Sequence, residues 1–155
     1  MLKGILVATD ASPAAHNAVD LGADLAAKYG ATLSLLYVAR DMQLPEEVSG
    51  MVELKELAGP RREVLRLVGQ RIIGTARVRA EKKGVERIDT AVAEGDPAEQ
   101  IINHAHARSV DLIVMGTRGL GQMKSMLLGS VSRKVINSTD ISCLVVKSEA
   151  DVPED

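Results

Sequence analysis

Residues 111–135 read DLIVMGTRGLGQMKSMLLGSVSRKV, which joins a short apolar strand, several glycines and a helix start. The apolar run Leu112–Met115 leads into Gly116 and Gly119, and Gly129-Ser130 follows after nine further residues. Glycine lets the backbone approach an anion closely, and N–H groups at a helix start favour bound phosphate. Gly-x2-Gly alone is typical of an ordinary turn, but the full Gly-x2-Gly-x9-Gly-Ser pattern is much rarer. We therefore predict that this segment binds nucleotide phosphates.

Two common phosphate-binding signatures do not fit this stretch. The Walker A loop requires glycine directly before Lys-Ser or Lys-Thr, whereas Met123 precedes Lys124-Ser125. The dinucleotide fingerprint requires a third glycine at the position that Lys124 occupies after Gly119-Leu120-Gly121. The stretch therefore predicts a phosphate loop of a different kind.

Two cations and two hydroxyls in this stretch are candidates for phosphate contact. Arg118 and Lys124 either neutralise phosphate charge or remain solvated, as charged loop residues commonly do. Ser130 and Ser132 either donate hydroxyls to phosphate or, in the case of Ser130, cap the last helix. The sequence leaves both alternatives open.

The composition is that of an ordinary globular domain. The chain has 155 residues, 46% hydrophobic and 26% charged, which predicts one domain over residues 1–148 and an acidic, disordered tail over 149–155. The net charge of −2 argues against a nucleic-acid surface, and two tyrosines as the sole aromatics cannot build a base-stacking platform. No apolar run reaches 18 residues, so we expect no membrane partner.

The N-terminus and the single cysteine bear on localisation. The first residues, MLKGILVATDAS, lack the long apolar region and cleavage site of a signal peptide and are typical of a first strand. Cys143 has no partner for a disulfide within the chain and lies in an apolar run, so we expect a reduced, buried thiol. Both features predict a cytoplasmic protein.

Five apolar runs predict the strands of a parallel sheet. Most are nearly continuous Val, Ile and Leu, as expected for strands that are covered on both faces. Helical patterns separate them, which predicts a three-layer, doubly wound, Rossmann-like α/β sandwich. The predicted strands are Gly4–Ala8, Thr32–Val38, Asp89–Ala93, Leu112–Met115 and Ser142–Lys147.

Capping signals mark two of the predicted helices. Ser12-Pro13 is typical of a helix start and Gly30 of a helix end. Asp96 with Glu99 three residues later resembles a capping box. In the first of these helices we expect one apolar stripe to face the sheet, formed by Ala18, Leu21, Leu25 and Tyr29.

The segment 39–60 departs from the regular pattern. It is mixed in polarity and too long for a simple connection, so we expect an irregular loop with a short helical piece around Glu47–Leu57. The next helix is expected to begin after Gly59-Pro60 and to end at Gly84.

A ligand crevice is expected where the strand order reverses, beyond the carboxyl ends of the first and fourth strands. It would be lined by Ala8-Thr9-Asp10 and by Gly116 onward. Asp10 either shapes the turn before the helix or accepts hydrogen bonds from a ribose hydroxyl, and the two roles are compatible.

The histidines do not form a site. His104 and His106 are two residues apart on a helix and therefore point to different faces, while His16 is isolated. We predict neither a metal site nor a catalytic constellation.

Across nearly its whole length the chain resembles a universal stress protein. The resemblance rests on ILVATDAS, LLYVAR, EGDPAEQI and DLIVMGTRG with LLGSVSRKVI and CLVVK. It implies a five-stranded parallel sheet in order 3-2-1-4-5, a homodimer through the fifth strand, and ATP or AMP between the first and fourth strands. Ala8 and Val38 fall at adenine contacts and Asp10 at a ribose contact. The phosphate side comprises Met115, Gly116, Gly119, Gly129, Ser130 and Val131.

Two positions depart from the family pattern. Ala8 stands where members often have proline, and Ala11 where many have glycine. Neither change removes a polar ligand contact, so nucleotide binding is expected to survive.

The leading hypothesis is a homodimeric regulatory protein of the stress response that acts on an unknown protein partner. It would bind ATP, AMP or ADP, and ATP would bind together with Mg²⁺. A slow ATPase or a phosphoryl or nucleotidyl transferase is the alternative, although no general base is evident near the glycine loop. A ligand-free dimeric scaffold is the third, and the intact Gly129-Ser130 argues against it.

Overall fold

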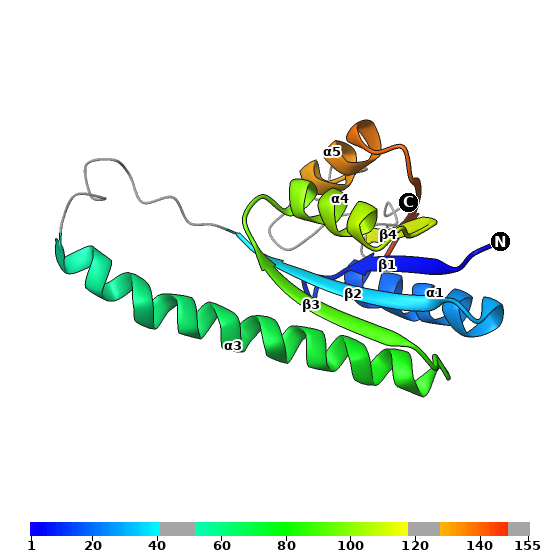
Figure 1. The fold of residues 1–155 in the computed structure, drawn as a ribbon, viewed down its shortest axis with the longest axis horizontal. Coiled ribbons are helices and arrows are strands. Elements are labelled where there is room, and N and C mark those ends of the chain that lie inside the picture. Colours follow the sequence, from blue (N-terminus) through cyan, green and yellow to red (C-terminus); the bar gives the residue numbers. More distant parts are fainter. Residues whose placement is uncertain (41–51, 118–127, 149–155) are drawn as a thin grey trace, which may run out of the picture.

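A five-stranded parallel sheet forms the middle layer, in the order β3-β2-β1-β4-β5 (Figure 1). The computed structural model describes residues 1–40, 52–117 and 128–148, and only the backbone of residues 52–60. The predicted α/β sandwich and strand order are confirmed. The elements are β1 (Gly4–Ala8), α1 (Pro13–Tyr29), β2 (Thr32–Ala39), α3 (Val52–Lys82), β3 (Ile88–Glu94), α4 (Pro97–Ala107), β4 (Leu112–Gly116), α5 (Ser130–Ser138) and β5 (Ser142–Val146).

Helices cover both faces of the sheet, which explains why the central strands are apolar at nearly every position. Ile5 and Val7 of β1 pack toward α1 and α3, and the alternate residue Leu6 packs toward α4 and α5. All three side chains are at most 1% exposed. The two cores lie back to back across β1, so this strand is the centre of the fold.

Helix α1 lies against the sheet mainly through small residues. Of the predicted stripe, Ala18 and Leu25 pack on the core, whereas the prediction is wrong for Leu21 and Tyr29. Leu21 is 37% and Tyr29 50% exposed, whereas Ala18 and Ala23 are fully buried. An added Cβ on Gly22 would lie 2.5 Å from Cγ2 of Val7. At Gly22 the helix is therefore so close to β1 that any side chain is excluded from the contact.

Helix α3 begins earlier than the sequence predicts. It starts at Val52, within the helical piece predicted around Glu47–Leu57, and runs on through Gly59-Pro60. The predicted break between this piece and the next helix is therefore wrong, while residues 41–51 lie outside the described ranges. Proline removes only one helical N–H, and the preceding residues VELKELA are mostly good helix formers. Among the described residues, no helix has the length and apolarity needed to cross a bilayer.

Ser12 and Asp96 cap the starts of α1 and α4 as predicted, and Gly30 ends α1. The Ser12 hydroxyl accepts the N–H of Ala15 at 3.2 Å, and Gly30 ends α1 with φ +63°. The Asp96 carboxylate accepts the N–H of Glu99 at 3.0 Å at the start of α4. These contacts fix the directions in which α1 and α4 leave their strands.

Asp111 ties the start of β1 to the start of β4. One of its carboxylate oxygens accepts the backbone N–H groups of Lys3 at 2.7 Å and Gly4 at 3.0 Å. These N–H groups, that of Lys3 first, hold the pKa of the Asp111 carboxyl below its ordinary value of 3.8. The carboxylate therefore stabilises the folded state.

We expect Asp111→Asn to lower the free energy of unfolding near neutral pH, because an amide oxygen is a weaker acceptor than a carboxylate. Because the pKa of Asp111 is lower in the folded than in the unfolded state, its carboxylate stabilises the folded state at pH values above the unfolded-state pKa. This stabilisation is lost as the pH falls through the folded-state pKa. The difference between variant and wild type should therefore shrink below about pH 4. Urea unfolding over a pH series measures it, with exposed Glu86→Gln as the control. A difference that is independent of pH would contradict the assignment.

Candidate functional site

A candidate crevice lies at the carboxyl ends of β1 and β4, where the strand order reverses. β1 and β4 are parallel neighbours with Val7 opposite Val114, so Thr9-Asp10 and Gly116-Thr117 leave the sheet at the same edge. β1 leads into α1 on one face, and β4 is followed by α5 on the other. Chains that diverge to opposite faces in this way open a crevice between them.

The turn from β1 into α1 lies at this edge and would form one wall of the expected crevice. Asp10 Oδ1 accepts the N–H of Ser12 at 2.9 Å, and Thr9 Oγ1 accepts the N–H of Ala11 at 3.3 Å. The turn-shaping role predicted for Asp10 is thus present, and the ribose contact stays a prediction. Ala11 has φ +66°, a region that favours glycine, which costs about 1 kcal/mol for alanine. The side-chain acceptors on both sides hold this strained turn in place.

The two described ends of the glycine pattern are joined to each other and to the sheet. The N–H of Gly129 donates to the carbonyl of Thr117 at 2.6 Å, and the N–H of Thr117 donates to the carbonyl of Val146 at 2.9 Å. The Ser132 hydroxyl donates to the carbonyl of Gly116 at 2.8 Å. The segment between Thr117 and Gly129 therefore leaves and returns at one point beside β4.

The amino end of α5 is located at this point. Gly129 occupies the N-cap position and provides no side-chain cap, and Ser130 is the first helical residue and is exposed. The alternative that Ser130 caps the helix is therefore wrong. The first N–H groups of a helix without a side-chain cap are suited to bind an anion.

Gly116 and Ser132 have structural roles that the sequence did not indicate. An added Cβ on Gly116 would lie 2.9–3.0 Å from atoms of Ala14 and Ala15, so this glycine lets β4 lie against the start of α1. The hydroxyl of buried Ser132 is bonded to a backbone carbonyl, which does not favour its predicted role as a phosphate donor. Both residues fix the relative positions of β4, α1 and α5.

The other predicted site residues are distributed around the same edge. Ala8 is the last residue of β1 and Val38 the last but one of β2, and both are half-buried. Val131 of α5 is half-buried beside the α4–α5 core. Met115 is 3% exposed and its side chain belongs to that core. Arg118, Gly119 and Lys124 lie outside the described ranges.

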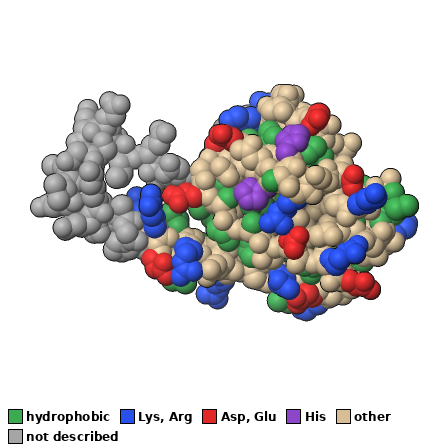
Figure 2. Space-filling view, in the orientation of Figure 1, with side chains coloured by type: hydrophobic (Ala, Val, Ile, Leu, Met, Phe, Trp, Pro, Cys, Tyr) green, Lys and Arg blue, Asp and Glu red, His purple; other side chains and the backbone are tan. Residues whose placement is uncertain are grey.

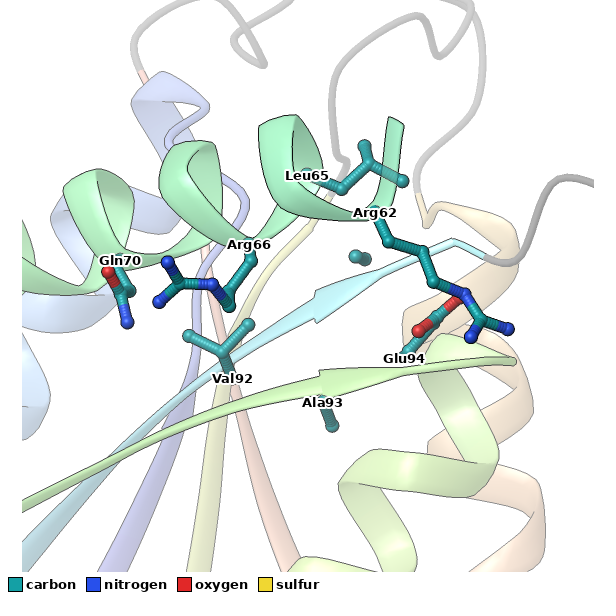
Figure 3. A pocket seen from close by; sticks show the side chains of 8 residues that line it. Arg62, Leu65, Arg66, Gln70, Val92, Ala93 and Glu94 are labelled. Atoms are coloured by element: carbon teal, nitrogen blue, oxygen red, sulfur yellow. The ribbon is translucent and has the colours of Figure 1, made fainter. Parts of the chain in front are cut away.

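A separate cavity of about 380 Å³ lies at the same edge of the sheet, on the β3 side of β1, between α3 and the ends of β2 and β3 (Figure 3). Arg62 extends beside Glu94 at one end, and Arg66 lies over Val92. Sequence reasoning missed it because it depends on how closely α3 approaches β3. Gly69 allows that approach, since an added Cβ would lie 2.8 Å from Cγ1 of Val92. An isolated glycine within a helical pattern was the available signal.

Metal-ligating side chains are dispersed over the described part of the chain, which holds no group of three or more His, Cys, Asp or Glu suited to bind a metal ion. His106 approaches Asp140 at 3.5 Å, and both are exposed.

Comparison with known proteins shows the relationship of the chain. The model of the universal stress protein family matches residues 1–147. The chain belongs to this family. Universal stress protein YxiE of Bacillus subtilis is 36% identical over 149 residues, covering 95% of this chain and all of YxiE. The predicted resemblance is confirmed.

Solved structures of universal stress proteins share the fold. The structure of protein MJ0577 matches with a TM-score of 0.82 and 27% identity, covering 96% of this chain and 98% of MJ0577. A universal stress protein in complex with cAMP matches with a TM-score of 0.69 and 24% identity, covering 94% of this chain and 97% of that one. The strand order and layers described above are thus those of the family.

Proposed function

We propose that this universal stress protein binds an adenine nucleotide in the crevice between β1 and β4 and acts as a regulatory protein of the stress response. The observation that carries the proposal is the joining of Thr117 to Gly129 beside the uncapped start of α5. This arrangement brings both described ends of the Gly-x2-Gly-x9-Gly-Ser pattern to one anion-binding position. A related structure of the same fold is a complex with cAMP, which supports the choice of an adenine nucleotide.

The nucleotide would cross the sheet edge from β2 to α5. The backbone near Val38 would meet adenine, with Ala8 beside it, and Asp10 would accept a ribose hydroxyl next to Thr9. The phosphates would meet the first backbone N–H groups of α5, those of Ser130 and Val131, and would lie close to the backbone of Gly116 and Gly129. Met115, Arg118 and Gly119 would be on the same side. In ATP, Mg²⁺ is held largely by phosphates and water, so its binding needs no cluster of acidic side chains.

We expect ATP to bind more tightly than GTP. Backbone groups at the end of β2 would recognise the amino edge of adenine, and guanine presents a carbonyl at that position, which reverses the hydrogen-bonding requirement. Isothermal titration of nucleotide-free protein measures both affinities. Equal or tighter binding of GTP would refute the recognition of adenine. It would not bear on the binding of the phosphates, which both nucleotides share.

We further propose that β5 pairs with β5 of a second copy to form a homodimer. β5 is an edge strand, and its residues Cys143–Val146 are only half-buried. Cys143 was expected to be buried, and its edge position explains the difference; partial burial raises the pKa of its thiol. An apolar edge with unpaired backbone groups is commonly covered by another strand, and a two-fold contact closes the assembly.

Val145→Pro is expected to shift the protein from dimer to monomer. The carbonyl of Val146 accepts a hydrogen bond from the β4 side, so the backbone groups of Val145 point to the free edge. Proline at residue 145 would remove an edge donor while the β4 pairing stays intact. Sedimentation velocity measures the shift, with Val145→Thr as a control that keeps the N–H. Wild-type protein that sediments as a monomer at micromolar concentration would contradict the dimer.

A further inference from the structure

The outer face of α3 exposes aliphatic side chains that no described part of the chain covers. Val64, Leu67, Val68 and Val78 are 58%, 53%, 44% and 49% exposed. Their spacing places them on one side of the helix, opposite Ile73, Ala76 and Ala80, which pack toward the sheet. Surface aliphatic residues are ordinarily scattered singly, so their alignment along one helix is informative.

The same helix is basic. Helix α3 contains eight Arg and Lys against four Glu, a net charge of +4, and the rest of the chain carries −6. Of these cations, Arg79 forms an ion pair with Asp20 of α1. Glu63 and Glu81 form ion pairs with Arg66 and Arg77 on one flank of the helix. Lys and Arg side chains recur along the margin of the molecule that α3 forms, with Asp and Glu side chains among them (Figure 2).

Two cations lie among the exposed aliphatic residues. The helical spacing places Arg71 and Lys82 on the outer side of α3, and the structure shows no ion pair of either with any residue it describes. We name the set Val64, Leu67, Val68, Arg71, Val78 and Lys82 the α3 outer face. It contains no acidic residue.

We propose that the α3 outer face docks on the surface of an anionic phospholipid bilayer. At such a surface, aliphatic side chains enter the boundary between head groups and acyl chains while Arg and Lys meet lipid phosphates. A nucleic acid would satisfy the cations but leave the aliphatic side chains in water. A second copy would place two basic helices against each other.

The charge asymmetry gives the docked molecule one orientation. The net charge of −6 on the rest of the chain is repelled by anionic lipid, and the net charge of +4 on α3 is attracted to it. The sequence-based expectation of no membrane partner relied on the absence of a spanning run, which does not test for docking on a bilayer surface. α3 packs on β2 and β3, away from β5, so docking leaves the fifth strand accessible.

Vesicle co-sedimentation with the full chain tests this surface. Vesicles of phosphatidylcholine alone are compared with vesicles containing about one-third phosphatidylglycerol, at about 0.1 M and about 1 M salt. We expect binding to the anionic vesicles that weakens at high salt, and little binding to the neutral ones. Arg71→Glu and Leu67→Glu should each reduce the binding at least about tenfold.

Matched changes on the opposite layer serve as controls. Arg133→Glu and Ile136→Glu alter exposed residues of α5 and should leave vesicle binding within about twofold of wild type. Thermal unfolding establishes that each variant is folded. The proposal is overturned if wild type does not bind anionic vesicles, or if the α5 changes weaken binding as much as the α3 changes. Two further results would overturn the proposal, because each would show that charge attraction alone causes the binding. One is undiminished vesicle binding by Leu67→Glu. The other is binding of a single-stranded RNA as tightly as the anionic vesicles at the same salt concentration.

Discussion

Gly116→Ala is expected to destabilise the fold by about 1–3 kcal/mol, because the new Cβ has no space. It would lie 2.9 Å from the Cβ of Ala14 and 3.0 Å from backbone atoms of Ala14 and Ala15. Backbone cannot rotate aside as a long side chain does, so β4 and the start of α1 must separate. In a domain of this size the loss corresponds to a fall in melting temperature of about 2–12 °C. Differential scanning calorimetry measures it.

Gly74→Ala provides a matched control with the opposite sign. Gly74 lies within α3, and an added Cβ there meets no atom within 4 Å. Alanine should therefore stabilise the protein by about 0.5–1 kcal/mol through its higher helix propensity. If both changes have the same sign and size, the close contact of Gly116 with α1 does not limit stability.

Gly129→Val is expected to weaken ATP binding at least about tenfold, which corresponds to about 1.4 kcal/mol. Gly129 is buried at the N-cap of α5, where the phosphates would have to approach the backbone. Its φ of −70° and ψ of 165° are extended values that valine adopts readily, so backbone strain is not expected to unfold the helix start. The loss should therefore arise from the space that the branched side chain takes. Isothermal titration with ATP measures it.

A graded series separates occlusion from misfolding. Gly129→Ala should weaken ATP binding less than Gly129→Val, since a methyl group fills less of the space. Ser130→Ala should leave the backbone N–H groups in place and cost less than the valine change. Normal binding by a folded Gly129→Val variant would show that the glycine serves only the turn.

The layered fold was predictable because its strongest signals are local. The buried strands are continuous apolar runs, and Ser12, Gly30 and Asp96 mark helix ends through contacts within three or four residues. The start of α3 was not predictable, because Pro60 weakens the helical pattern without ending the helix. Propensity alone does not decide whether neighbouring residues compensate for one missing N–H.

The site was predictable in outline but not in the roles of individual residues. The glycine pattern indicated the segment beside β4, and only the fold shows that Thr117 and Gly129 meet. The contacts of Gly116 with α1 and of Asp111 with β1 join residues about one hundred positions apart. No local pattern encodes such contacts, which arise from the packing of whole elements.

The most direct measurement is amide chemical-shift mapping by NMR during titration with ATP and Mg²⁺. We expect saturable shifts concentrated at Thr9–Ala11, Val38, Thr117 and Gly129–Val131, and their loss in Gly129→Val. Shifts confined to the cavity between α3 and β3, at residues such as Arg62 and Gln70, would contradict binding between β1 and β4. An absence of saturable shifts at millimolar ATP would contradict nucleotide binding itself.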